Sequence, residues 1–150
     1  MNHLYQRYAP MLVRKAERML RHREDAVDLV HTLFVDLLAQ GGAVPDLPYL
    51  YRAVTNRCLN VLRDSRNRQR LLATTPWPEH TLSEEARMLT METLLTLVKR
   101  LDARQAEVLA YYFLDDMTQD EIAEVTGISR RTIVTDLQSI RELAQKEALS

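Results

Sequence analysis

The stretch TQDEIAEVTGISRRTIVTDL, from Thr118 to Leu137, has the pattern of two short helices joined by a tight turn. Thr118 and Glu121 have the spacing of a capping box, which starts a helix by satisfying its first backbone N–H groups. Gly127 stands where the first helix must end in a left-handed conformation, and Ser129 can cap the second helix. The pattern predicts a helix-turn-helix, which is more specific than an ordinary helical hairpin.

The second helix of this stretch has an apolar face and a polar face. Its apolar positions recur at intervals of three and four residues and are Ile133, Leu137, Ile140 and Ala144. Side chains on the polar face can reach base edges or phosphates. The candidates there are Ser129, Arg130, Arg131, Thr132, Thr135 and Gln138. Asp136 and Glu142 are expected on or beside the same face, where a carboxylate weakens binding to phosphates.

The remainder of the 150-residue chain is also expected to be helical. Hydrophobic residues make up 46% of it, enough for a packed core, while 3 Gly and 5 Pro leave long stretches without helix breakers. Apolar residues at helical spacing predict further helices over residues 1–22, 25–40, 49–70, 84–100 and 103–114. The fold class is therefore all-α, in one domain or two small ones.

A segment rich in proline and hydroxyl residues divides the chain. The triplet P-W-P at 76–78 forbids regular helix. We therefore expect two small helical domains, 1–70 and 86–150, joined by a flexible linker over 71–85. Residues 1–70 hold 12 Lys and Arg against 7 Asp and Glu, a balance of +5, and the rest hold 8 against 14, a balance of −6. This asymmetry indicates either two modules with different partners or attraction between the halves, which would permit a closed form.

The last helix expected in the first half is strongly basic. Between residues 52 and 70 it carries six arginines against one acid, Asp64. Tyr49 and Tyr51 stand at its start, after the loop GGAVPDLP at 41–48. Arginines track phosphates and aromatic rings stack on unpaired bases, so this helix suits single-stranded or melting DNA. A solvated basic face with core tyrosines is the alternative.

The sequence carries no motif of catalysis or metal binding. Its four histidines are scattered, without an HExxH, P-loop or GxSxG pattern, so we expect no enzyme activity, metal or cofactor. A single cysteine, Cys58, excludes an internal disulfide and fits a cytoplasmic protein. No apolar run is long enough to cross a bilayer, and the N-terminus lacks the apolar core of a signal peptide. We therefore expect no membrane insertion.

Taken together, the two halves resemble an RNA polymerase sigma factor of the extracytoplasmic-function type, which keeps only sigma regions 2 and 4. DAVDLVHTLFVDLL at 25–38 resembles the region 2.2 pattern, and PYLYRAVTNRCLNVLR at 48–63 resembles the end of region 2. The stretch at 98–133 resembles the region 4 pattern. The resemblance covers nearly the whole chain, and it implies region 2 for residues 1–70 and region 4 for residues 86–150.

The resemblance also implies a role for each group of residues. Docking on core RNA polymerase would fall to Asp28, Leu29, His31, Thr32 and Phe34. Melting and reading the promoter −10 element, with a base flipped out beside the loop at 42–49, would fall to Tyr49, Arg52, Asn56, Asn60 and Arg63. The candidates on the second helix of the helix-turn-helix would read the −35 element. The linker would thread toward the RNA exit path, and an anti-sigma factor is the partner that the family implies.

The chain departs from the family pattern in its recognition helix. Three positions that are usually basic are Val134, Asp136 and Ser139, while Arg131 replaces a Gly. Because phosphate neutralisation dominates affinity for DNA, −35 binding is expected to be weaker or differently placed. We therefore expect an alternative sigma factor that directs promoter recognition. The alternatives are a sigma-like mimic that sequesters an anti-sigma factor and a stand-alone helix-turn-helix regulator.

Overall fold

The computed structural model describes residues 2–73, 85–86 and 89–149, and every regular element within them is a helix. The prediction of an all-α fold is confirmed. The elements are α1 (Asn2–Leu20), α2 (Arg23–Gln40), α3 (Leu47–Arg63), a 3-10 turn (Ser65–Asn67), α4 (Arg68–Leu72), α5 (Met91–Arg100), α6 (Ala103–Leu109), a π-helical turn (Ala110–Leu114), α7 (Gln119–Thr126) and α8 (Arg130–Leu149).

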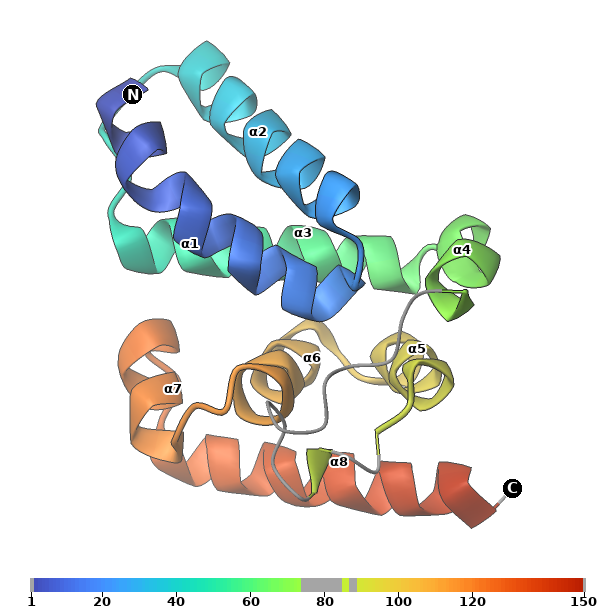
Figure 1. Cartoon of the computed structure of the whole chain (residues 1–150). Helices are drawn as coiled ribbons and strands as arrows, with labels where there is room; N and C mark the ends of the chain where they lie inside the picture. The colour runs from blue at the N-terminus through green and yellow to red at the C-terminus, as the bar shows by residue number, and fades with distance from the viewer. Residues whose placement is uncertain (1, 74–84, 87–88, 150) are drawn as a thin grey trace.

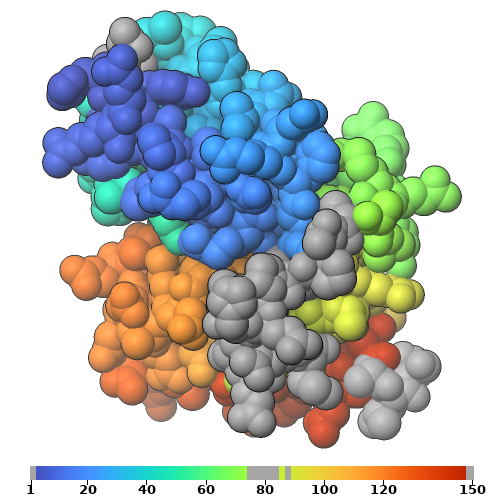
Figure 2. Space-filling model, in the orientation of Figure 1, coloured from blue at the N-terminus to red at the C-terminus, as the bar shows by residue number. Residues whose placement is uncertain are grey.

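The helices form two groups that meet along α3 (Figure 1). The N-terminal group consists of α1 to α4, and the C-terminal group consists of α5 to α8. One side of α3 packs on α1 and α2, and another side packs on α5, α6 and α7. Figure 2 shows the two groups in direct contact, with the blue N-terminal surface pressed against the orange C-terminal surface. The protein is therefore closed on itself, as attraction between oppositely charged halves would permit.

Short polar side chains set where the helices of the N-terminal group begin. His22 Nδ1 accepts a hydrogen bond from the backbone N–H of Asp25 at 3.3 Å and starts α2. Asp46 accepts from the backbone N–H of Tyr49 at 3.0 Å and starts α3. Between these helices Gly41 and Gly42 have φ values of 67° and 93°, which L side chains rarely adopt. The loop expected to cup a flipped base thus begins at two glycines in positive φ and ends at the Asp46 cap of α3.

The prediction that the third helix runs to residue 70 is wrong, because α3 ends at Arg63. Asp64 leaves the helical conformation and its Oδ1 accepts from the backbone N–H of Arg66 at 3.0 Å. That contact turns the chain into the 3-10 turn and then into α4. Leu71 of α4 is fully buried, so ordered structure continues past the expected domain boundary at 70.

The helix predicted over residues 84–100 begins later, at Met91. Thr90 has extended backbone and its hydroxyl accepts from the backbone N–H of Thr93 at 3.1 Å, which makes it the N-cap of α5. A capped start at this position excludes a continuous helix through the preceding residues 89 and 90. The P-W-P triplet and Trp77 lie outside the described residues.

One hydrophobic core runs through both groups of helices. In the C-terminal group, the predicted apolar face of α8 is buried, since Ile133, Leu137 and Ile140 are at most 1% exposed, and Ala144 is partly buried. Cys58 of α3 is fully buried, as expected for a core residue. Apolar burial at this density is the main source of stability in a fold of this size. It also fixes the orientation of the polar faces described next.

Candidate nucleic-acid interface

The helix-turn-helix predicted from residues 118–137 is present as α7, a three-residue turn and α8. Thr118 and Glu121 form both bonds of the capping box, at 2.9 and 3.1 Å. Gly127 ends α7 with φ 75° and ψ 1°, in the left-handed region. Ser129 Oγ accepts from the backbone N–H of Thr132 at 3.2 Å and caps α8. Each of these local predictions is confirmed.

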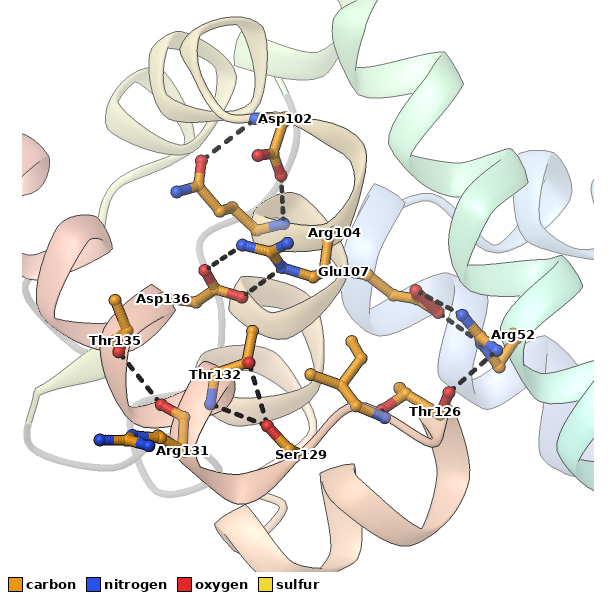
Figure 3. A network of polar contacts seen from close by, with 12 residues as sticks. Arg52, Asp102, Arg104, Glu107, Thr126, Ser129, Arg131, Thr132, Thr135 and Asp136 are labelled. Atoms are coloured by element: carbon orange, nitrogen blue, oxygen red, sulfur yellow. Dashed lines mark hydrogen bonds and ion pairs between the residues drawn. The ribbon is translucent and has the colours of Figure 1, made fainter.

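The polar face of α8 is open to solvent over its first turns. Of the six candidate residues there, Thr132 is half-buried and the other five are exposed. The hydroxyl groups of Ser129 and Thr132 hydrogen-bond each other at 3.0 Å, and Thr135 donates to the backbone oxygen of Arg131 at 3.1 Å (Figure 3). The guanidinium of Arg131 points away from this network. Arg130, in contrast, is held by α7, since its Nε donates to Gln119 Oε1 at 3.3 Å and its Nη1 lies 3.3 Å from Asp120 Oδ1.

Asp136 is buried, so the expectation that it lies on or beside the exposed face of α8 is wrong. The residue is 1% exposed. Arg104 of α6 donates through Nε and Nη2 to the two carboxylate oxygens, each at 2.8 Å (Figure 3). This donation raises the pKa of the Arg104 guanidinium. The acid is thus neutralised inside its own group of helices, and it does not lie on the exposed face of α8.

The candidate residues of α3 follow one line along the helix, at intervals of three and four residues. We call this line the α3 ridge, and it consists of Tyr49, Arg52, Asn56, Asn60 and Arg63. Tyr49 is 53% exposed, and the two asparagines are also exposed. The two arginines lie on the side that faces the C-terminal group, and both are engaged by it.

Arg52 is held by an acid of the C-terminal group. Its Nε and Nη2 donate to Glu107 Oε1 and Oε2 at 2.7 and 3.1 Å, and its Nη1 donates to the backbone oxygen of Thr126 at 3.4 Å (Figure 3). The hydrogen bonds to Glu107, above all, raise the pKa of Arg52. The Glu107 side chain is only 5% exposed and also accepts from the Tyr111 hydroxyl at 2.9 Å. At the other end of the ridge, Arg63 Nε donates to the backbone oxygen of Val98 at 3.1 Å.

A second set of contacts joins the two groups near the end of α1, and we call it the Asp115 cluster. The carboxylate of Asp115 accepts from Lys15 Nζ at 2.5 Å, from Arg18 Nη2 at 3.0 Å and from the Tyr51 hydroxyl at 2.8 Å. The side chains of Lys15 and Asp115 are 0% and 1% exposed. Burial, above all, lowers the pKa of Lys15. Tyr51 also stacks on Tyr111, with ring centroids 6.0 Å apart.

The residues expected to dock on a polymerase lie on α2, and most face solvent. Asp28, His31 and Thr32 are exposed, and Leu29 is half-buried. Phe34 is 4% exposed and packs edge-on against Tyr5, so it holds α2 in place in this conformation.

A groove of about 520 Å³ runs between α2 and α3. Asp28, Leu29 and Thr32 line it on one side, and Asn60 and Arg57 line it on the other. Two sets of candidates that the sequence treats separately, on α2 and on the α3 ridge, therefore border one surface.

Sequence reasoning misses both contact sets between the groups, although one residue carries a signal of them. Lys15 falls among Leu12, Ala16 and Met19, which places a charge on the apolar face of α1. A lysine on a buried face requires a buried acid opposite it. Which acid provides the partner depends on how the groups pack, and the sequence does not contain that information.

Two family models match the chain, one over the N-terminal group of helices and one over the C-terminal group. Residues 4–68 match the family described as Sigma-70 region 2, and residues 91–143 match the family described as Sigma-70, region 4. The first match covers α1 to α3 and the 3-10 turn, and the second covers α5 to most of α8. The chain thus carries a sigma-70 region 2 followed by a sigma-70 region 4. Sigma regions 2 and 4 are DNA-recognition domains without catalytic activity, so this sigma factor takes part in promoter recognition.

Further comparisons add the following facts about this sigma factor. No curated protein matches the chain. Within residues 2–73, 85–86 and 89–149, no helix is long and apolar enough to cross a membrane. The same described residues contain no group of three or more His, Cys, Asp and Glu side chains that could hold a metal ion.

Proposed function

We propose that this chain is an alternative sigma factor of the extracytoplasmic-function type, which binds core RNA polymerase and directs transcription initiation. The observation that carries the proposal is that one chain joins region 2, with α2 and the α3 ridge, to region 4, with a largely exposed polar face on α8. Only residues 73–90, 18 positions, separate α4 from α5. A segment shorter than roughly 40 residues is too short for a further stable domain, which supports the two-region type.

The roles we assign follow the faces of the helices. α2 would dock on core polymerase through Asp28, His31 and Thr32, and the groove beside it would continue that surface. The α3 ridge would read the −10 element, with Tyr49 stacking on an unpaired base. The α8 face would read the −35 element, since Arg can pair with guanine and Gln with adenine. The burial of Asp136 supports this last role because it removes an acid from the DNA-facing side.

Reconstituted transcription is the direct test of the proposal. The protein is mixed with core RNA polymerase and genomic DNA, and the 5′ ends of the transcripts are sequenced. We expect defined start sites that share two upstream elements at fixed spacing. Polymerase binding without transcripts would indicate that an activator is missing. Absence of both would reject the sigma role and favour a mimic that binds an anti-sigma factor, which would then be sought as the partner.

A pair of arginine variants separates −35 reading from general charge. Arg131→Gln removes an exposed guanidinium from the reading face, whereas Arg141→Gln removes one that is already paired with Glu85 at 2.6 Å. If Arg131 neutralises one phosphate, its loss reduces the slope of log affinity against log salt by about 0.9 for duplex DNA. The Arg141 variant should keep the wild-type slope. Equal slopes for all three proteins would remove Arg131 from the proposed interface.

A second pair tests the α3 ridge in the polymerase complex. Arg52→Gln and Arg63→Gln should reduce promoter opening while leaving polymerase binding intact, because α2 is unchanged. Arg66→Gln is the matched control just beyond the same helix, since Arg66 lies outside the ridge and the groove and pairs with Asp64 at 2.7 Å. Permanganate footprinting of unpaired thymines measures opening directly. Equal opening by the three variants and the wild type would argue against a reading role for the ridge.

An anti-sigma factor and a cytoplasmic location belong to the same proposal. The anti-sigma factor follows from the family resemblance, and the cytoplasmic location follows from the work of a sigma factor on polymerase.

A further inference from the structure

We propose that Val134 reads the methyl group of a thymine in the −35 element. In the complex its side chain lies in the major groove against the 5-methyl carbon of that base, three residues along α8 from the guanidinium of Arg131. The inference rests on the proposed −35 role of α8 and deepens it, because it names a base that the helix selects.

Val134 is the apolar member of an otherwise polar, exposed face of α8. It is 45% exposed, and its neighbours at helical spacing on the same face are the exposed Arg131 and Gln138. Among the described residues of α5 to α8, no other large hydrophobic side chain is classed as exposed. The core side of the same turns is formed by Ile133 and Leu137, which are fully buried. Val134 is therefore available to a ligand of α8 and takes no part in the core.

The neighbours of Val134 in the sequence are already engaged within the protein. The Thr135 hydroxyl donates to the backbone oxygen of Arg131 at 3.1 Å. Asp136 is buried and accepts from Arg104 at 2.8 Å. At this turn of α8 the exposed side chain without a hydrogen-bonding role is that of Val134. A base edge opposite the turn therefore meets an apolar group.

The thymine methyl is the base group in the major groove that an apolar side chain can match. Adenine, guanine and cytosine present hydrogen-bond donors or acceptors there, whereas thymine adds a 5-methyl group. An apolar side chain packed on a donor or acceptor removes its water without replacing the hydrogen bond. A valine on a helix has one strongly preferred rotamer, so Val134 presents its methyl groups in a fixed direction. Burial of the thymine methyl corresponds to about a fourfold gain in affinity.

A valine at this position changes what kind of contact the helix makes. The sigma pattern that the chain resembles usually has a basic residue here, and a basic side chain binds phosphate, which carries no sequence information directly. Val134 cannot make that contact, and its methyl contact depends on the base. The substitution therefore lowers general affinity for DNA and raises selectivity at one base pair.

Uracil replacement tests the inference, because uracil differs from thymine only by the missing methyl group. The full-length chain first selects duplexes from a pool with a randomised central segment, at low salt, where binding to phosphates is strongest. Each thymine of the selected duplex, in either strand, is then replaced in turn by uracil, and binding is measured by fluorescence anisotropy. We expect one thymine whose replacement weakens wild-type binding about fourfold, and no such thymine for Val134→Ala.

Two further variants separate the methyl contact from other effects. Val35→Ala truncates a valine of α2 that is 49% exposed, and it should keep the uracil penalty of the wild type. Val134→Lys should lose the penalty, while the slope of log affinity against log salt should become steeper by about 0.9, because a phosphate contact replaces the base contact. Circular dichroism checks that each variant keeps the helical content of the wild type.

The outcomes distinguish this inference from the −35 role on which it rests. A selected duplex without a uracil-sensitive thymine would overturn the inference and leave the −35 role intact. An equal penalty in the wild type and Val134→Ala would do the same, because another residue would then contact the methyl group. Failure to select any duplex would reject the −35 role, and the inference with it.

Discussion

Helices α3 and α8 are both proposed to bind DNA. They differ in which part of the molecule pairs with their own charged side chains. On α8 the one buried acid, Asp136, is paired within region 4 by Arg104, and most of the polar face stays exposed. On α3 the arginines Arg52 and Arg63 are engaged by region 4, across the boundary between the regions. The comparison teaches that a local pattern can define a helix proposed to read DNA, whereas tertiary contacts decide whether that helix is available.

The largest expected effect breaks the contact that keeps α3 covered. Asp115→Asn leaves the ammonium of Lys15 buried without a counter-charge, and an unpaired buried charge costs about 3–5 kcal/mol. We therefore expect the free energy of unfolding, measured in urea by circular dichroism, to fall by about that amount. The buried lysine is the physical reason, since its side chain is 0% exposed.

The adjacent residue provides the control for this experiment. Asp116 is exposed and has φ 55°, a conformation that Asn accepts well. Asp116→Asn should change the free energy of unfolding by less than about 0.5 kcal/mol. A similar loss in both variants would show that the Asp115 cluster does not stabilise the closed protein.

The next largest loss of stability is expected when Asp136 of α8 loses its partner. Arg104→Ala leaves Asp136 buried without its partner, which costs about 1–3 kcal/mol for an unsatisfied buried group. Asp136→Ala should destabilise the protein less, because the Arg104 side chain is 48% exposed and can be solvated. The midpoints of thermal unfolding of the two variants show which one is less stable. The opposite order would mean that Asp136 is not neutralised by Arg104 in solution.

The same contrast between α8 and α3 explains how much the sequence can predict. The capping box at Thr118, the left-handed Gly127 and the Ser129 cap are contacts between residues at most four apart, so their geometry is set locally. The partner of Arg52 is 55 positions away and that of Lys15 is 100 positions away. Such pairs depend on how helices pack.

The burial of Asp136 also escapes sequence reasoning. On the helix, Asp136 adjoins the apolar positions Ile133 and Leu137, as well as the exposed Thr135. Whether its side chain is buried or exposed depends on Arg104 of α6, 32 positions away. The end of α3 is not predicted either, for a local reason. The helical spacing of apolar residues continues past Arg63, but Asp64 ends the helix there and caps a short 3-10 turn.

A pH titration probes the covered side of α3 through Cys58. Burial, above all, raises the pKa of its thiol from the ordinary value of 9.0 to about 12. The folded protein therefore keeps a proton that the unfolded chain loses, so the stability from this group is complete below pH 9 and is lost as pH rises toward 12. The slope is about 1.4 kcal/mol per pH unit.

Comparison with Cys58→Ala isolates this contribution from the other groups that titrate at alkaline pH. The difference in free energy of unfolding between wild type and variant should be constant from pH 6 to 8 and then move against the wild type at roughly that slope. A difference that stays constant up to pH 10.5 would mean that water reaches the thiol, and so that α3 is less covered than the closed form requires.

The smallest effect tests the local origin of the α8 geometry. Gly127 has φ 75°, and a Cβ added there would meet no atom within 4 Å. Gly127→Ala should therefore cost only the strain of a left-handed L-residue, about 1–2 kcal/mol. Gly127→Asn should cost less, because Asn tolerates this conformation. A much larger loss for both would point to a packed surface over the turn. Equal losses near zero would mean that the turn changes conformation freely, and the orientation of α8 would then depend on long-range packing, as the availability of α3 does.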